Sequence, residues 1–162
     1  MLLANTRLLA AISAPYGDAN SSTGANVVSA GHIHIFKRNS TGSWNADQLL
    51  TAEGSKAYDY LGFAMDFNAA GTQLVASAHG HDGSSTGGAS GAGALHMFSR
   101  TAEGEFTLQK TVFHSDAAAG DGFGYGASFG KGKLLLHRPW LMLCGCAAIG
   151  FFACVDLLHA CT

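Results

Sequence analysis

The chain has 162 residues, a net charge of −2 and only 12% charged residues. Its basic residues are scattered rather than gathered in a stripe, so we expect no nucleic-acid partner. The length suits one domain with a real core. Glycine is abundant, with 22 residues, and proline is scarce, with 2, which is typical of short strands joined by glycine-rich turns. All four cysteines follow residue 143, so the preceding part has no disulfide framework.

The first residues, MLLANTRLLAAISAPYG (1–17), superficially resemble a signal peptide. The match is poor because Arg7 follows the first leucines and the apolar run after it is short. The stretch AAISAPY (10–16) is better explained as a strand.

Four further short strands are expected along the next part of the chain. GHIHIF (31–36) alternates, with Ile33 and Ile35 on one face and His32, His34 and Phe36 on the other. The other three runs are SWNADQLLTA (43–52), YLGFAMDFN (60–68) and TQLVASA (72–78). Four short antiparallel strands are the make-up of one propeller blade.

The sequence repeats itself after about 62 positions. The shift aligns His34 with His96, Phe36 with Phe98, Gly42 with Gly104, Trp44 with Phe106, Asp59 with Asp121, Gly62 with Gly124 and Phe67 with Phe129. Glycines fix turns and aromatic side chains fill cores, so we expect the aligned aromatic residues to be buried.

An earlier partial copy precedes these units, because AAISAPYGDANSSTG (10–24) resembles LVASAHGHDGSSTGG (74–88). The repeat divides the chain as follows: residues 1–30 form the last strand and loop of a preceding blade, 31–92 form one repeat, 93–136 an incomplete second repeat, and 137–162 an apolar tail that contains the cysteines. The glycine- and serine-rich loop after residue 78 is expected to connect one blade to the next.

The repeat unit resembles the FG-GAP repeat, the blade of integrin-α-type β-propellers. GHIHIF (31–36) and GALHMF (93–98) correspond to the family's G-A-V-Y-V-F-like strand. DGFGYGA (121–127) and, less closely, DYLGFAM (59–65) correspond to its D-x-F-G-x-S-V-like strand, and LVASAHG (74–80) to its L-V-V-G-A-P-like strand. The resemblance implies an all-β fold of antiparallel four-stranded blades, about two of them with a partial N-terminal strand.

The resemblance also implies a non-catalytic recognition or adhesion module, extracellular or membrane-associated, with a protein or glycan partner. Loops on a rigid scaffold carry binding, so the candidates lie in loops 15–30 and 79–92. The candidate binding residues are Asp18, Asn20, His79, His81 and Asp82. Calcium is not expected, because each loop has a single acid where a hard cation needs six or more oxygen ligands. Open strand edges favour self-association.

An enzyme is the less favoured alternative. A metal-dependent hydrolase could use His79, His81 and Asp82, but zinc needs three or four convergent ligands. The strand pair His32 and His34 is a weak metal candidate, because His32 aligns with Ala94 in the second copy. We therefore expect no enzyme, no metal and no cofactor.

The tail HRPWLMLCGCAAIGFFACVDLLHACT (137–162) has three interpretations. Its uncharged run, residues 140–155, falls just short of the roughly 17–25 residues of a spanning helix, so it is a marginal membrane anchor in a structural protein. It also suits a buried helix. The abrupt loss of the repeat favours the third interpretation, a segment foreign to the repeat domain. The spacing of Cys144, Cys146, Cys154 and Cys161 does not match a zinc site.

Overall fold

The computed structural model describes residues 2–3, 8–20, 26–84, 88–130, 133–137 and 153–155, and every regular element in this part of the chain is a β-strand. The strands are β1 (Leu2–Leu3), β2 (Leu9–Ala14), β3 (Ala19–Asn20), β4 (Asn26–Val27), β5 (His32–Arg38), β6 (Trp44–Leu50), β7 (Met65–Phe67), β8 (Gln73–Ala78), β9 (Ala94–Arg100), β10 (Phe106–Val112), β11 (Gly126–Gly130), β12 (Lys133–His137) and β13 (Ala153–Val155). The expected all-β class is confirmed.

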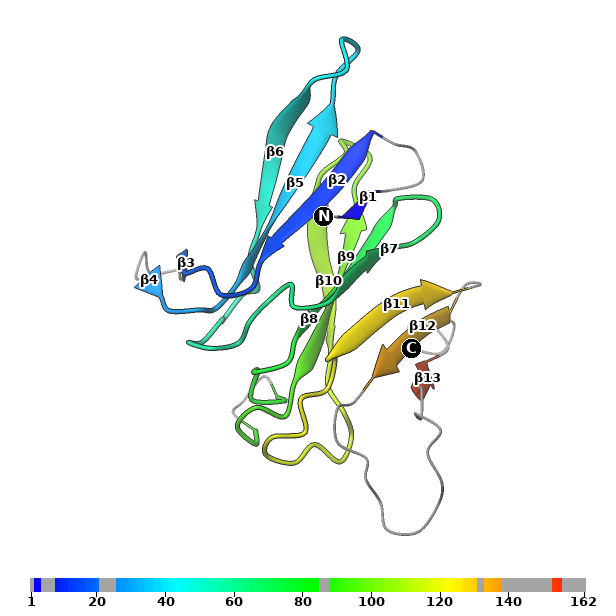
Figure 1. Ribbon diagram of the computed structural model, residues 1–162. Helices are drawn as coiled ribbons and strands as arrows, with labels where there is room; N and C mark the ends of the chain where they lie inside the picture. The colour runs from blue at the N-terminus through cyan, green and yellow to red at the C-terminus, as the bar shows by residue number, and fades with distance from the viewer. Residues whose placement is uncertain are drawn as a thin grey trace.

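Three antiparallel sheets and one small ribbon organise these strands (Figure 1). The first sheet has the order β1-β2-β5-β6 and the middle sheet the order β7-β8-β9-β10, so each is a four-stranded meander. The third sheet has the order β11-β12-β13, and β3 and β4 form the ribbon. Edge strand β7 lies beside both β1 and β11, the corresponding edges of the other two sheets.

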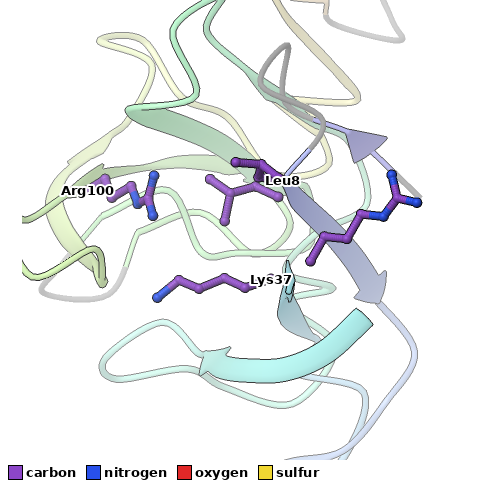
Figure 2. Close-up of a pocket in the computed structure, with 5 residues that line it drawn as sticks. Leu8, Lys37 and Arg100 are labelled. Atoms are coloured by element: carbon purple, nitrogen blue, oxygen red, sulfur yellow. The ribbon is translucent and has the colours of Figure 1, made fainter. Parts of the chain in front are cut away.

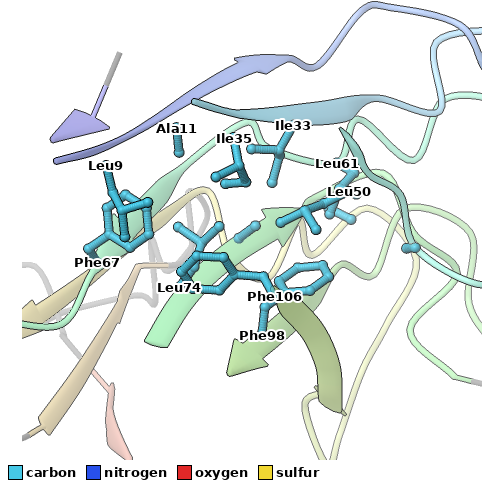
Figure 3. Packing of buried hydrophobic residues seen from close by; sticks show 13 residues of the cluster. Leu9, Ala11, Ile33, Ile35, Leu50, Leu61, Phe67, Leu74, Phe98 and Phe106 are labelled. Atoms are coloured by element: carbon cyan, nitrogen blue, oxygen red, sulfur yellow. The ribbon is translucent and has the colours of Figure 1, made fainter. Parts of the chain in front are cut away.

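The largest core lies between the first and middle sheets (Figure 3). Ile33 and Ile35 are fully buried there, as their alternation in the sequence predicts. They meet Leu74, Phe98 and Phe106 of the middle sheet, which are also buried. At about 25 cal/mol per Å² of apolar surface, this face-to-face packing is the main source of stability for the pair of sheets.

A second core joins the middle and third sheets. Val75 and Leu95 point to the opposite side from Leu74 and Phe98, because side chains alternate along a strand. They pack with Phe123 and Leu134, and Phe129 adds a partly buried ring. The middle sheet is therefore covered on both faces.

The sequence repeat is matched by the strand pairing. Phe36 pairs with Ala10 and Ala46, and its counterpart Phe98 pairs with Leu74 and Leu108 in the same way. A β-bulge also recurs, because Asp47 in β6 and Gln109 in β10 are both skipped in the pairing. The two sheets are thus built from the same local pattern.

The hairpins repeat too. The Arg38 Nε donates to the Gly42 carbonyl at 2.9 Å, and the Arg100 Nε donates to the Gly104 carbonyl at 3.1 Å. Gly42 and Gly104 have φ values of 91° and 92°, a conformation that glycine adopts at no steric cost.

The loop prediction needs correction. The loop after residue 78 joins β8 to β9, two strands of the middle sheet, rather than one sheet to the next. The connections between sheets are residues 51–64 and 113–125. The predicted boundaries between the units 1–30, 31–92 and 93–136 accordingly fall inside sheets. A sequence repeat has no defined starting point, whereas a sheet begins at its edge strand.

The predicted third strand is shorter than its sequence pattern. YLGFAMDFN (60–68) contributes only β7, Met65–Phe67. Tyr60 has a φ of 60° and Gly62 a φ of 88°, so the backbone turns in the left-handed region and cannot continue as an extended strand.

The prediction that the aligned aromatic residues are buried is wrong for Trp44. Its counterpart Phe106 is 2% exposed, whereas Trp44 is 41% exposed, because Phe106 faces the first sheet and the face that carries Trp44 is not covered by another sheet in the described structure. Most of the tail (137–162) lies outside the described residues. His137 ends strand β12, and Ala153–Val155 form strand β13 against β12, so the helical interpretation is wrong for these residues.

Candidate functional site

The predicted binding loops lie at one end of the sheets, here called the rim. It consists of loops 15–30 and 79–92 together with connections 51–64 and 113–125. Each loop is hydrogen-bonded to the connection that follows it, as the Tyr60 N–H donates to the Ser29 carbonyl at 3.2 Å and the Leu61 N–H to the Ala30 carbonyl at 2.8 Å. The Phe123 N–H donates to the Ala92 carbonyl at 2.8 Å in the second copy. The rim is thus a hydrogen-bonded structure rather than a set of separate loops.

Asp18 closes its own loop. Its Oδ2 accepts from the Asn26 Nδ2 and its Oδ1 accepts from the Ser29 N–H, both at 3.0 Å. Asn20 lies in β3, and its side chain is outside the described part of the structure. Asp82 is the counterpart of Asp18. Its Oδ2 instead forms an ion pair with the Lys56 ammonium, at 2.6 Å. This contact raises the pKa of Lys56.

His79 and His81 belong to different clusters. The His79 ring stacks on Tyr60, with 5.0 Å between centroids and 12° between planes. The His81 ring lies 5.4 Å from Phe113, and its Nδ1 accepts from the Gly83 N–H. Among the described residues, no three histidine, cysteine, aspartate or glutamate side chains converge as they would around a metal ion. The hydrolase alternative draws no support from this arrangement.

His96 is enclosed in the core beside His81, with 6.0 Å between ring centroids. Its Nδ1 lies 3.0 Å from the Thr111 hydroxyl, and its Nε2 has no hydrogen-bond partner. Burial, helped by the nearby His81, lowers the pKa of His96 to about 4. The neutral imidazole at this place is a packing group of the core.

Asp59 and Asp121 have a structural role that the motif resemblance left open. The Asp59 Oδ2 accepts from the Lys56 N–H at 2.8 Å, and the Asp121 Oδ2 accepts from the Ala118 N–H at 2.9 Å. Both carboxylates therefore close the same turn in successive connections. Asp59 is only 3% exposed, and its burial raises its pKa.

A group of aromatic side chains dominates the rim, and the sequence repeat does not predict it. This group, here called the rim cluster, consists of Tyr16, Tyr58, Tyr60, Phe63, His79 and Tyr125. The sequence held one signal for it. All four tyrosines of the chain lie in the rim, three of them one or two residues from an aspartate.

Each ring of the rim cluster contacts the next, from the first sheet past the middle sheet to the connection that leads to the third sheet. Tyr16 meets Tyr60 edge to face at 5.3 Å, and Tyr60 stacks on His79. Phe63 lies 4.2 Å from His79 and 4.8 Å from Tyr125. Burial lowers the pKa of His79, so this ring is neutral at pH 7. The His79 Nδ1 is buried and has no partner.

The outer members of the rim cluster remain accessible. Tyr16, Tyr58 and Tyr125 are 67%, 56% and 43% exposed. Tyrosine combines a rigid apolar ring with a hydroxyl, and for this reason it is enriched at binding surfaces. The rim cluster can therefore offer both ring faces and hydroxyl groups to a partner.

A pocket of about 230 Å³ lies at the end opposite the rim (Figure 2). Its lining consists of Leu8, Leu9, Lys37, Arg38 and Arg100. The two arginines close hairpins through their Nε atoms, and Lys37 pairs with Asp47 at 2.8 Å. These cations thus have partners within the fold, and the pocket carries less of a functional signal than the rim.

Comparisons with known proteins add no assignment. No protein-family model matches the chain, and a search of curated proteins finds no similar sequence. The part of the chain that the structure describes contains no helix with the length and apolar character needed to cross a membrane.

Proposed function

We propose that the protein is a non-catalytic recognition module built from FG-GAP-like propeller blades, with a protein or glycan partner that binds at the rim. Two four-stranded antiparallel meanders with the same pairing and the same bulge support the blade assignment. Edge strand β7 lies next to both edge strand β1 and edge strand β11, as neighbouring inner strands do around a propeller axis.

The rim cluster is the observation that carries the binding assignment. Its rings form one connected surface from Tyr16 to Tyr125, although these residues come from loops of different sheets. Anchors at binding interfaces are most often tyrosine, tryptophan and arginine on a rigid support. The hydrogen bonds between loops and connections supply that support.

The test is a binding screen with the full chain, labelled on a lysine, against a glycan array and an array of extracellular-domain proteins. We expect a ligand on one array, and the variant with Tyr16→Ala and Tyr125→Ala should bind it at least tenfold more weakly. Trp44→Ala is the control, because it removes an exposed ring away from the rim, at 41% exposure against 43% for Tyr125. Equal binding by wild type and the rim variant, or no ligand on either array, would contradict the proposal.

A further inference from the structure

One face of the first sheet carries an apolar surface, here called the open face, which consists of Ile12, His34, Phe36, Trp44 and Leu49. Ile12, His34 and Leu49 are neighbours across the strands, because His34 pairs with both of the others. Phe36 lies two residues further along β5, and Trp44 pairs with Arg38. Ile33 and Ile35, which alternate with His34 and Phe36 along β5, point to the middle sheet instead. The open face is thus the side of the first sheet turned away from the rest of the described structure.

The open face is the counterpart of a buried face. The same pairing in the middle sheet places Ala76, His96 and Thr111 in a row, and this row lies on the side that packs against the first sheet. Ala76 is fully buried, whereas its counterpart Ile12 is 38% exposed. The pair Phe106 and Trp44 shows the same difference, at 2% and 41%.

Two of the exposed positions, Ile12 and Leu49, are more apolar than their buried counterparts, whereas Ala10 and Ala46 replace Leu74 and Leu108. Ile12 stands where the middle sheet has Ala76, and Leu49, 54% exposed, stands where it has Thr111. An antiparallel sheet that faces water normally carries polar side chains on that side. Exposed apolar side chains gathered on one face of a domain mark an interaction surface.

The stacking of the sheets indicates what covers the open face. The first sheet packs on the counterpart face of the middle sheet, and the middle sheet packs on the corresponding face of the third. The stack therefore has a direction, and in the described part of the chain its two outermost faces are the open face and the far side of the third sheet. The natural complement of the open face is the far side of another sheet of the same repeat.

The far side of the third sheet is marked by Ser128. Ala127 and Phe129 pack toward the middle sheet, so Ser128, which is exposed, points away from it. Ser128 is the counterpart of Asp66, whose Oδ2 accepts from the Phe129 N–H at 2.8 Å and so joins the middle and third sheets. Ser128 therefore places a polar side chain on the far side of the third sheet, at the position from which Asp66 joins the middle sheet to the third.

We propose that a second copy of this chain covers the open face with the far side of its third sheet, so that copies associate head to tail. The contact extends the existing stack by one more junction of the same kind. It is heterologous, and such contacts produce rings when the rotation closes and open chains when it does not. Among the described residues that pair with members of the open face, Arg38 is the one with a charged side chain. It pairs with Trp44, and its Nε donates to the Gly42 carbonyl.

Sedimentation of the full chain tests the proposal. The mass should exceed that of the 16.7 kDa chain and rise with concentration up to about 100 µM. Leu49→Glu and Ser128→Glu should each give monomers, because each places a charge at one side of the contact. Val28→Glu is the matched control, since Val28 is 48% exposed but lies in a rim loop, and this variant should associate like wild type.

Mixing the two monomeric variants separates head-to-tail contact from other modes. A 1:1 mixture of Leu49→Glu and Ser128→Glu chains should form a dimer through the one remaining intact pair of surfaces, which also shows that both variants are folded. A monomeric wild type, an associating Ser128→Glu chain, a monomeric Val28→Glu chain or a mixture that stays monomeric would each overturn the proposal.

Discussion

His96 ties the stability of the fold to pH. Its pKa in the folded protein is about 4, below the ordinary value of 6.5, because the ring is buried. As the pH falls below 6.5, the unfolded chain takes up a proton at this ring before the folded protein does. The free energy of unfolding should therefore decrease between pH 6.5 and pH 4, by up to about 3 kcal/mol from this residue.

Urea unfolding at pH 7, 5.5 and 4.5 measures this effect in wild type and in His96→Gln, which has no imidazole to protonate. The difference between the two chains isolates His96, because the shifted pKa values of His79 and Asp59 are common to both. A difference that does not change with pH would contradict the prediction.

At Gly93 the backbone of loop 79–92 closely approaches the backbone of connection 113–125, and a substitution there tests this contact. The φ of Gly93 is 92°, and a Cβ there would overlap the carbonyl oxygen of Phe123. Gly54 also has a positive φ, 73°, but nothing lies within 4 Å of its Cβ position. Gly54→Ala should cost about 1–2 kcal/mol for the backbone conformation alone.

Gly93→Ala should cost about 1–3 kcal/mol more than Gly54→Ala, because the loop and the connection must also move apart. Thermal unfolding of the two variants gives the comparison. Equal losses of stability would show that the contact between Gly93 and Phe123 is not tight in solution.

Residue positions were predictable where the sequence alternates. Ile33 and Ile35 are buried and His34 faces the other way, as the period of two requires. The rim cluster was not predictable in this way, because Tyr16, Tyr60 and Tyr125 are far apart in sequence and meet only through the hydrogen bonds between loops and connections.

At the scale of the strands, Gln48 is the polar link between the outer strands of two sheets. Its Nε2 donates to the Phe106 carbonyl at 2.7 Å, and its Oε1 accepts from the Phe106 N–H at 2.8 Å. Gln48→Ala should destabilise the protein by about 1–3 kcal/mol, because two partly buried backbone groups lose their partner.

Gln109→Ala is the matched control for Gln48→Ala. Gln109 lies at the bulge of β10 and is exposed, and its Nε2 donates to the Thr107 hydroxyl at 2.9 Å. Its loss should change stability by less than about 0.5 kcal/mol. If urea unfolding shows the same loss for both variants, the Gln48 link contributes nothing of its own.

Strand positions followed from the sequence better than strand partners did. The predicted run GHIHIF (31–36) lies in β5 from His32 onward, and β5 extends two residues further to Arg38. The run TQLVASA (72–78) coincides with β8 except for its first residue. The partners were misassigned because local periodicity says nothing about which edge begins a sheet. The glycine- and serine-rich loop 79–92 looked like a link between blades, whereas it joins adjacent strands and packs on the next connection.

At the scale of the molecule, stability should be greatest in the middle sheet. Strand β8 is paired on both sides by β7 and β9, and its residues from Leu74 to Ala78 are at most 1% exposed. Strand β6 is an edge strand with mostly exposed side chains. Local opening requires little free energy where few apolar contacts must be broken.

Amide hydrogen exchange followed by mass spectrometry gives the test. Peptides that cover β8 should exchange slowest, and peptides that cover β6 should exchange at least tenfold faster. Equal protection of the two strands at low protein concentration would mean that the sheets open only together.

The repeat in the sequence was enough to predict the kind of sheet and its strand number, because glycine turns and aromatic residues recur in one register. It could not predict which copy of each aromatic residue is buried. Phe106 and Trp44 occupy the same place in their sheets, and their different exposure depends on whether a neighbouring sheet is present.

The exposure of Trp44 has an optical consequence. An indole in contact with water emits at longer wavelength than one enclosed by apolar groups, so Trp44 reports directly on whether its surroundings are wet or dry. The chain has one other tryptophan, Trp140, and replacing it by phenylalanine leaves Trp44 as the single emitter. A shift of this emission to shorter wavelength would then follow, without any label, the moment at which another molecule covers the first sheet.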